Sequence, residues 1–297
     1  MDIKPVFFER NRVARVYTGG KLFGDFFGDE PVDGFLPEEW IASAVKALNK
    51  DSVVENEGVS KLYGSDIYFD EFLKGNEEKL LGSKGVLRIL VKALDSSIRL
   101  PAQAHPDKAF SRKYFNSEYG KTECWIILGT RPDAKIYFGF KDGVTKEDFE
   151  KAIDESETNL NAMEDLMLYI TPKVGEVYLV PARTVHAIGK GCLILEVQEP
   201  TDFTIQPERF CGDYKLSDQE MYLGLDREIA VSCFDFTKAP DNKMVPEIIE
   251  RCENMEKESL VSEKNTDCFR RELAYNIETL DTYMALVVKN PPADEET

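Results

Sequence analysis

The chain has little histidine and little positive charge. Only two of its 297 residues are histidines, His105 and His186, so any chemistry that needs an imidazole must use one or both. There are 37 lysine and arginine residues against 55 aspartate and glutamate residues, which gives a formal net charge of −18. This charge has the wrong sign for a protein that binds nucleic acid or anionic lipid through a general surface field. We therefore expect neither of these partners.

Long apolar runs and paired cysteine motifs are also missing. No stretch approaches the ~18 uninterrupted apolar residues of a membrane helix, while the hydrophobic share of 42% is typical of a globular protein. The six cysteines form no C-x-x-C pair, and the opening MDIKPVFFER has no apolar segment of the kind found in a secretory signal. We therefore expect no membrane partner, buried free thiols, and a reducing, cytoplasmic compartment.

Short β-rich runs recur through the middle of the chain, mostly separated by glycine, proline or aspartate. They lie at 86–94, 124–130, 134–140, 175–182 and 192–199. This pattern favours a sandwich or barrel of antiparallel strands. Helices are expected at 66–81, after the capping-box pair Thr145 and Asp148, and from Pro106, which stands at a plausible first helical position.

The pattern changes beyond about residue 226. A strand-like segment, EIAVSCFDF at 228–236, is followed by a dense mixed-charge run at 241–266 and by a polar tail. We expect two units, a larger domain at 1–225 and a smaller C-terminal unit at 226–297.

One set of residues has the composition of a metal site. Gln103 and His105 stand two residues apart, so on a strand both side chains point to the same face. Glu123 follows 18 residues after His105, and His186 follows 63 residues after Glu123. A lone histidine in a strand is more often a structural residue than a ligand, and a Q-x-H pair alone is weak evidence for a metal site. Together, two imidazoles, a carboxylate and an amide oxygen suit zinc or another divalent first-row ion.

The context of the second histidine strengthens this interpretation. The pattern G-x5-P-x4-H, formed by Gly175, Pro181 and His186, resembles the second motif of the cupin barrels. More specifically, a series of segments between about residues 4 and 206 resembles class I mannose-6-phosphate isomerase in order and spacing. The segments are KPVFFER, EEW at 38–40, LVKALD at 90–95, QAHPDK at 103–108, GKTECW at 120–125 and VHAIGKGCLILEVQE at 185–199.

The resemblance implies a fold and a metal centre. The fold would be an all-β cupin jelly-roll barrel with helical insertions, followed by an incomplete or degenerate second cupin-like β unit. One zinc or other divalent ion per chain would be bound by the residues that match the family's ligands: Gln103, His105, Glu123 and His186.

The resemblance also implies a reaction, the interconversion of mannose 6-phosphate and fructose 6-phosphate through a cis-enediol. With both histidines on the metal, we expect Glu196 or Lys121 to transfer the proton, and Lys92 and Lys108 to hold hydroxyls or phosphate. The segment from Lys92 to Trp125 carries six basic against four acidic residues, a local positive excess in an acidic chain. Such an excess suits an anionic sugar.

Three departures from the family pattern leave the substrate open. Pro101 replaces a serine, Gln206 replaces an arginine, and Arg183 replaces a turn glycine; Arg183 or Arg209 would have to restore a guanidinium. The alternatives are a non-catalytic sugar-binding or sugar-phosphate-sensing cupin, or a cupin isomerase that acts on another sugar. A cupin oxygenase fits less well, because that class more often uses an H-x-H pair, which this chain lacks. The oligomeric state is left open.

Overall fold

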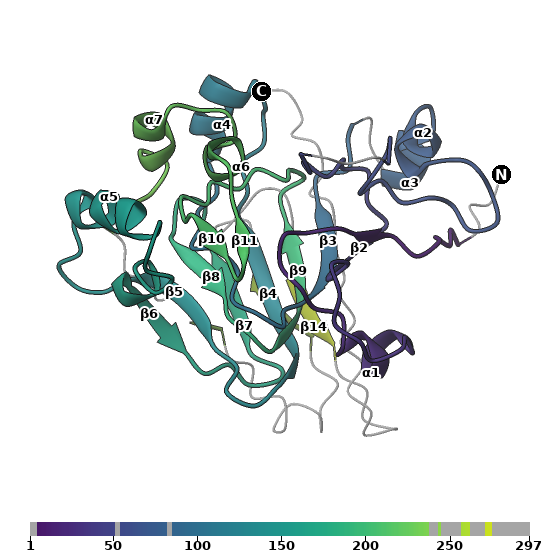
Figure 1. The fold of residues 1–297 in the computed structure, drawn as a ribbon. Coiled ribbons are helices and arrows are strands. Elements are labelled where there is room, and N and C mark those ends of the chain that lie inside the picture. Colours follow the sequence, from purple (N-terminus) through teal and green to yellow (C-terminus); the bar gives the residue numbers. More distant parts are fainter. Residues whose placement is uncertain are drawn as a thin grey trace.

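The computed structural model describes residues 5–50, 54–81, 85–237, 243–244, 257–261 and 271–274, and most of their regular structure is β (Figure 1). The strands are β1 (Arg12–Val13), β2 (Glu38–Ile41), β3 (Leu90–Asp95), β4 (Glu123–Thr130), β5 (Ile136–Phe140), β6 (Met167–Ile170), β7 (Val177–Val180), β8 (His186–Ile188), β9 (Cys192–Gln198), β10 (Phe210–Cys211), β11 (Tyr214–Lys215), β12 (Lys243–Met244), β13 (Lys257–Val261) and β14 (Arg271–Ala274). The helices are α1 (Phe23–Phe27), α2 (Phe69–Leu73), α3 (Glu77–Leu81), α4 (Lys108–Phe115), α5 (Lys146–Glu155), the 3-10 turn Glu164–Leu166, α6 (Asp218–Tyr222) and α7 (Arg227–Val231). All five β-rich runs predicted from the sequence contain a strand.

Two antiparallel sheets form the body of the structure. The larger has the order β1-β2-β3-β9-β4-β7-β12, and the smaller has the order β6-β5-β8. The two sheets meet at Trp125 of β4, whose ring lies 6.3 Å from that of Phe138 and 5.5 Å from that of His186, centroid to centroid. The mostly β architecture with added helices is therefore confirmed. The described strands form open sheets, so closure into a barrel is not confirmed.

The register of the larger sheet places charged residues inside it. One row crosses five strands through directly paired residues: Trp40, Lys92, Glu196, Trp125 and Tyr178. All five are at most 3% exposed. Because side chains alternate along a strand, this row shares one face of the sheet with the residues two positions away on each strand. A lysine and a carboxylate therefore lie side by side between buried aromatic rings.

The helices agree with the sequence in part. The capping box of Thr145 and Asp148 is confirmed at the start of α5. The placement of Pro106 at the first helical position was wrong, because Asp107 caps α4 by accepting a hydrogen bond from the Phe110 N–H. The helix expected at 66–81 is divided into α2 and α3, and Gly75 lies between them with a φ of 81°.

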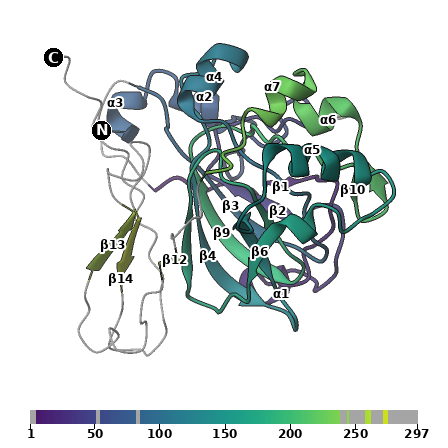
Figure 2. The same ribbon diagram turned by 90° about the vertical axis from the view of Figure 1, so that its left-hand side faces the viewer.

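The segment beyond residue 226 begins with a helix. The strand expected at 228–236 was wrong, since Arg227–Val231 forms α7 and residues 232–236 form turns and bends. The helix buries Ala230 and Val231 in the same hydrophobic core as the sheets. Burial on one side of a short helix outweighed the β preference of its isoleucine and valine. Further on, β12 pairs with β7, and β13 pairs with β14 (Figure 2). The rest of the expected C-terminal unit lies outside the described residues.

The structure also bears on the predictions about thiols and about membrane helices. The cysteines within the described ranges, Cys124, Cys192, Cys211 and Cys233, are all buried thiols that form no disulfide. Cys252 and Cys268 lie outside the described residues. In the described part of the chain, no helix has the length and apolar character needed to cross a membrane.

Candidate metal centre and adjoining charge network

Three of the four predicted ligand residues converge. His105 Nε2 lies 3.1 Å from His186 Nε2 and 3.2 Å from Glu123 Oε2, and His186 Nε2 lies 3.3 Å from Glu123 Oε1. All three side chains are at most 1% exposed. Glu123 opens β4 and His186 opens β8, so one residue from each sheet meets the loop that carries His105. The three residues form a compact set of candidate ligand atoms.

The hydrogen bonds of both imidazoles turn their Nε2 atoms inward. His105 Nδ1 donates to the carbonyl oxygen of Phe203, and His186 Nδ1 donates to that of Thr184, each at 2.9 Å. A neutral imidazole with a protonated Nδ1 has its lone pair on Nε2. Burial, together with the charge of Lys121, lowers the pKa of His105 to about 3, and burial also lowers the pKa of His186. Two lone pairs therefore face each other beside a carboxylate.

This donor set fits a divalent cation. Two nitrogen lone pairs and a carboxylate at contact distance repel one another unless a cation offsets that repulsion. The Lys121 ammonium does so in part, since it lies 2.9 Å from His105 Nε2 and 3.0 Å from Glu123 Oε2. A tetrahedral zinc with ligands at about 2.0–2.1 Å keeps those ligands about 3.3 Å apart, close to the 3.1–3.3 Å found here. The backbone carbonyls that accept from the Nδ1 atoms fix the ring orientations, as partners of metal-bound histidines do.

Gln103, the fourth predicted ligand, lies beside His186. The two residues exchange both backbone hydrogen bonds, Gln103 N–H to His186 O and His186 N–H to Gln103 O, each at 2.9 Å. Residues paired in this way project their side chains to the same face. Gln103 is 8% exposed. The backbone therefore places its amide on the side of the sheet where the histidine ring lies.

Lys121 and Glu196 adjoin the three candidate ligands. Lys121 Nζ is 2.9 Å from His105 Nε2, 3.0 Å from Glu123 Oε2 and 3.8 Å from Glu196 Oε1. Lys92 Nζ lies 3.2 Å from the same Glu196 oxygen. That oxygen accepts no hydrogen bond from any described residue. The carboxylate is therefore held by two ammonium groups and still has accepting capacity.

The surroundings of Glu196 and Glu123 shift their pKa values in opposite directions. Burial and the negative charge of Glu123 raise the pKa of Glu196 to about 7, against the opposing effect of Lys92 and Lys121. Burial alone would raise the pKa of Glu123, but the nearby positive charge of Lys121 opposes it, and that pKa lies well below its usual range. One carboxylate stays ionised, while the other titrates near neutral pH, as an acid–base group should.

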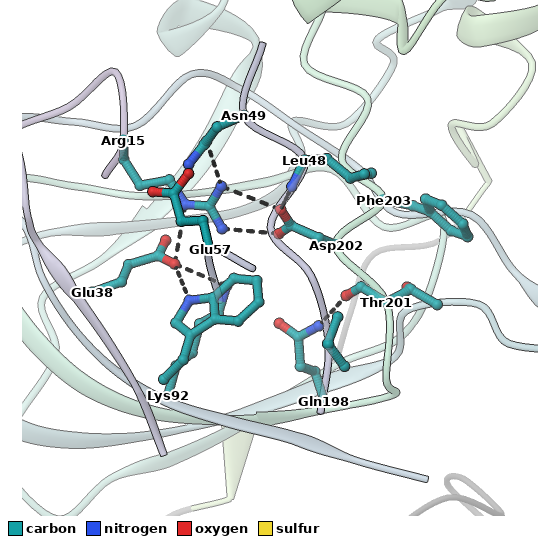
Figure 3. Close-up of polar contacts among 12 residues, drawn as sticks. Arg15, Glu38, Leu48, Asn49, Glu57, Lys92, Gln198, Thr201, Asp202 and Phe203 are labelled. Carbon is teal, nitrogen blue, oxygen red and sulfur yellow. Dashed lines mark hydrogen bonds and ion pairs between the residues drawn. The ribbon is translucent and has the colours of Figure 1, made fainter. Parts of the chain in front are cut away.

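Sequence reasoning missed the network around Glu38. Glu38 Oε2 lies 3.1 Å from Arg15 Nε and 3.6 Å from Lys92 Nζ, and Arg15 also binds Asp202 through both terminal nitrogens (Figure 3). Burial would raise the pKa of Glu38, but Arg15 and Lys92 lower it to about 2. The available signal was alternation in the EEWI strand, which places Glu38 on the same face as the buried Trp40.

No protein-family model matches the chain. A mannose-6-phosphate isomerase of Streptococcus mutans is 33% identical over 202 residues, which are 68% of this chain and 59% of that protein. One from Bacillus subtilis is 32% identical over 220 residues, or 74% of this chain and 64% of the relative. The chain is a relative of the mannose-6-phosphate isomerases. It spans about three fifths of the length of the first curated relatives that it matches.

Solved structures of mannose-6-phosphate isomerases share the fold. The Bacillus subtilis enzyme superposes with a TM-score of 0.64 at 22% identity, covering 92% of this chain and 77% of that chain. A zinc-bound mannose 6-phosphate isomerase gives a TM-score of 0.63 at 14% identity, covering 91% of this chain and 83% of that chain.

A cavity of about 1030 Å³ opens beside the candidate metal centre. Lys121, Glu196, Lys92 and Gln103 contribute to its wall. Pro101 and Gln206, two of the positions where the chain departs from the mannose-6-phosphate isomerase pattern, also line it. The charged residues of the wall are seven basic against five acidic: Arg10, Arg12, Arg15, Lys50, Lys61, Lys92 and Lys121 against Glu38, Glu57, Glu196, Asp202 and Glu220. A chain of net charge −18 has therefore gathered a positive excess in its cavity.

Three predicted substrate-binding residues are not part of this cavity wall. Lys108 lies 3.7 Å from Glu199, at the start of α4. The Arg209 guanidinium is 2.6 Å from Glu157 and 2.9 Å from Asp218. The third is Arg183, described next.

Arg183 adopts a φ of 72° in the turn where the family has glycine. Its guanidinium donates to the carbonyl oxygens of Cys233 and Ser232 and lies 3.4 Å from Asp107. These contacts hold the side chain against the segment that follows α7, which offsets the strain of a left-handed conformation at a non-glycine residue.

Proposed function

We propose that the protein is a metal-dependent aldose–ketose isomerase that interconverts mannose 6-phosphate and fructose 6-phosphate. The observation that carries this proposal is the juxtaposition of a buried His–Glu–His set with Glu196, a carboxylate whose pKa is raised to about 7. Isomerisation needs both parts, a cation site for the developing oxyanion and a base that works near neutral pH. The names of the relatives supply the sugar.

The metal we propose is zinc or another divalent first-row ion, one per chain. His105, Glu123 and His186 would hold it, with Gln103 as the fourth ligand. Such an ion supplies Lewis-acid stabilisation of negative charge on the substrate oxygens, on the order of several kcal/mol.

Glu196 is the base in this proposal. Its carboxylate takes the proton from C2 of the open-chain aldose and returns it to C1 of the enediol, while a hydroxyl proton moves from O2 to O1. In this proposal Lys121, which lies 3.8 Å from Glu196, carries that second proton. Lys92 holds the Glu196 carboxylate from the opposite strand. Burial of these groups keeps water away from the enediol.

The charge of the cavity wall supports an anionic sugar. Its seven basic and five acidic residues would attract a phosphate to a chain that otherwise repels anions. Lys92 and Lys121 lie on this wall. The expectation that they bind the substrate follows from the family resemblance alone. The substrate contacts of Lys108, Arg183 and Arg209 stay predictions, since their described partners lie elsewhere.

The finer architecture is proposed with the function. The two facing sheets are interpreted as a cupin jelly roll over residues 1–225, with α7 packed on it and a second, incomplete or degenerate cupin-like unit within 226–297. The free, buried cysteines support a reducing, cytoplasmic location.

A coupled assay tests the function. It measures fructose 6-phosphate formed from mannose 6-phosphate by protein loaded with zinc, with and without a chelator. Turnover that the chelator abolishes is expected; turnover that a chelator leaves unchanged contradicts the metal-dependent mechanism. Pro101 and Gln206 on the cavity wall favour a second candidate, a sugar-phosphate-binding protein without activity. That candidate predicts tight binding of mannose 6-phosphate, measured by calorimetry, and no product.

A further inference from the structure

A ladder of alternating charges runs from one side of the cavity wall to the candidate metal centre. Successive charged atoms lie 2.9 Å apart from Asp202 to Arg15, 3.1 Å from Arg15 to Glu38, 3.6 Å from Glu38 to Lys92, 3.2 Å from Lys92 to Glu196, 3.8 Å from Glu196 to Lys121 and 3.0 Å from Lys121 to Glu123. The seven side chains are between 1% and 13% exposed. Each interior charge of the ladder is thus neutralised by a neighbour on both sides.

Glu38 is fully engaged within this ladder. Tyr17 Oη donates to Glu38 Oε1 at 2.5 Å, and Trp40 Nε1 donates to Oε2 at 2.7 Å. Arg15 and Lys92 approach the same Oε2. With both oxygens occupied by protein donors, Glu38 has little capacity left for a substrate. Its influence on chemistry must therefore pass through a neighbour.

Lys92 is the neighbour that connects Glu38 with the base. It stands directly opposite Glu196 in the pairing of β3 with β9, and directly opposite Trp40 in the pairing of β3 with β2. Its ammonium lies between two carboxylates, 3.6 Å from Glu38 and 3.2 Å from Glu196. If Glu38 were uncharged, the two buried cations Lys92 and Arg15 would each lose one of their acidic partners. Lys92 would then be drawn toward Glu196, and the carboxylate would be shifted and held more tightly.

We propose that Glu38 is a positioning residue that, through Lys92, fixes the carboxylate of Glu196 for proton transfer. This inference rests on the proposed isomerase function. It assigns to Glu38 an effect on kcat with little effect on substrate affinity, because misplacing a reacting group changes the chemical step while the sugar's other contacts remain.

The test compares two neighbouring carboxylates of β2. Glu38→Gln removes the charge and keeps the size of the side chain. Glu39→Gln is the matched control: Glu39 is 5% exposed, against 3% for Glu38, and pairs with Arg12 at 3.1 Å, but it faces the other side of the strand and is not part of the cavity wall. We expect Glu38→Gln to lower kcat about tenfold or more with KM within about threefold, and Glu39→Gln to leave both within about threefold. Equal losses in the two variants would show a merely structural role and overturn the proposal.

A double-mutant cycle tests the route through Lys92. If Glu38 acts through Lys92, adding Glu38→Gln to Lys92→Met changes kcat by less than about threefold, whereas independent effects multiply. Multiplying effects overturn the proposal, as does a change confined to KM. Circular dichroism and metal content are measured on every variant. If Glu38→Gln does not fold, Glu38→Asp, which keeps the charge on a shorter side chain, takes its place in the cycle.

The proposed function is checked first, on the wild-type protein. Metal-loaded wild type that does not convert mannose 6-phosphate removes the isomerase assignment and this inference together. Wild-type turnover with no specific effect of Glu38→Gln removes the inference alone.

Discussion

Replacing Glu196 by glutamine removes the proposed base while keeping a side chain of the same size beside Lys92 and Lys121. A general base contributes about 10²–10⁴-fold to a rate, which corresponds to about 3–5 kcal/mol of activation free energy. Because the amide cannot take up the C2 proton, we expect kcat for mannose 6-phosphate to fall by this factor. KM should change far less, since Glu196 is buried and held by protein cations.

The pH profile of the wild-type protein gives the same prediction a second readout. Burial and the charge of Glu123 raise the pKa of Glu196 to about 7, and the base works only when ionised. Turnover should therefore rise about tenfold per pH unit below that value and level off above it. Well below that value most of the protein carries a protonated Glu196, so the rate should lie well below the plateau.

The assay couples fructose 6-phosphate formation to a reporter reaction, with metal content measured on each preparation. Glu176→Gln is the control, because Glu176 is 4% exposed, bonds to Tyr178 and is not part of the cavity wall. Full turnover by metal-loaded Glu196→Gln, or a wild-type profile that is flat between pH 5 and 8, would refute the assignment of Glu196 as the base.

Three further predictions follow from the same geometry. Chelation should abolish turnover and lower the melting temperature, because a ligand that binds only the native state stabilises it; re-addition of zinc should restore both, and a melting curve unaffected by zinc would contradict the site. Acid should weaken the fold through Glu38, whose pKa is lowered from 4.5 to about 2: its stabilisation, about 3 kcal/mol, is complete above pH 4.5 and is lost as the pH falls toward 2. Urea titrations at pH 6 and pH 3 measure that loss, which should be smaller in Glu38→Gln. Gly58→Ala should destabilise the protein by about 1–3 kcal/mol in urea titration, because the new methyl would lie 2.7 Å from the ring of Trp40 at a φ of 90°; an unchanged midpoint would contradict this packing.

The sequence was most informative where local residues mark the ends of strands and helices. The five β-rich runs contain strands because each is rich in apolar, β-branched or aromatic residues and turn residues stand in most of the gaps between them, and the capping box at Thr145 is a local interaction. The segment at 228–236 shows the limit, since an isoleucine and a valine suit a strand or the buried side of a short helix, and the choice depended on the core beneath. The predicted helix start at Pro106 was also wrong, because Asp107 forms the N-cap and α4 begins at the next residue.

The candidate site was predictable where residue type restricts the options and was missed where long-range pairing decides. Two histidines and a carboxylate have the composition of a metal site, and the resemblance of the segments around them to one family singled out His105, Glu123 and His186. In the structure their candidate ligand atoms lie within 4.8 Å of one another. Nothing local marks Arg15 as a partner of Asp202, which lies 187 residues further along the chain. Conversely, Arg183 has the residue type for a phosphate, but its turn directs it to the carbonyls of residues 232 and 233.

Burying so many charges is costly unless each has partners, and the arrangement of this chain explains why they are kept. Four carboxylates and three cations alternate from Asp202 to Glu123, so the ladder carries a formal charge of −1 when all are ionised. A divalent cation among His105, Glu123 and His186 would change that charge to +1, and a sugar phosphate carrying about two negative charges would return it to −1. The net charge of the ladder therefore stays between about −1 and +1 when the divalent cation binds and when the sugar phosphate follows. The positive excess of the cavity wall comes from outside the ladder, from Arg10, Arg12, Lys50 and Lys61 against Glu57 and Glu220, and this is the charge that would attract the anion.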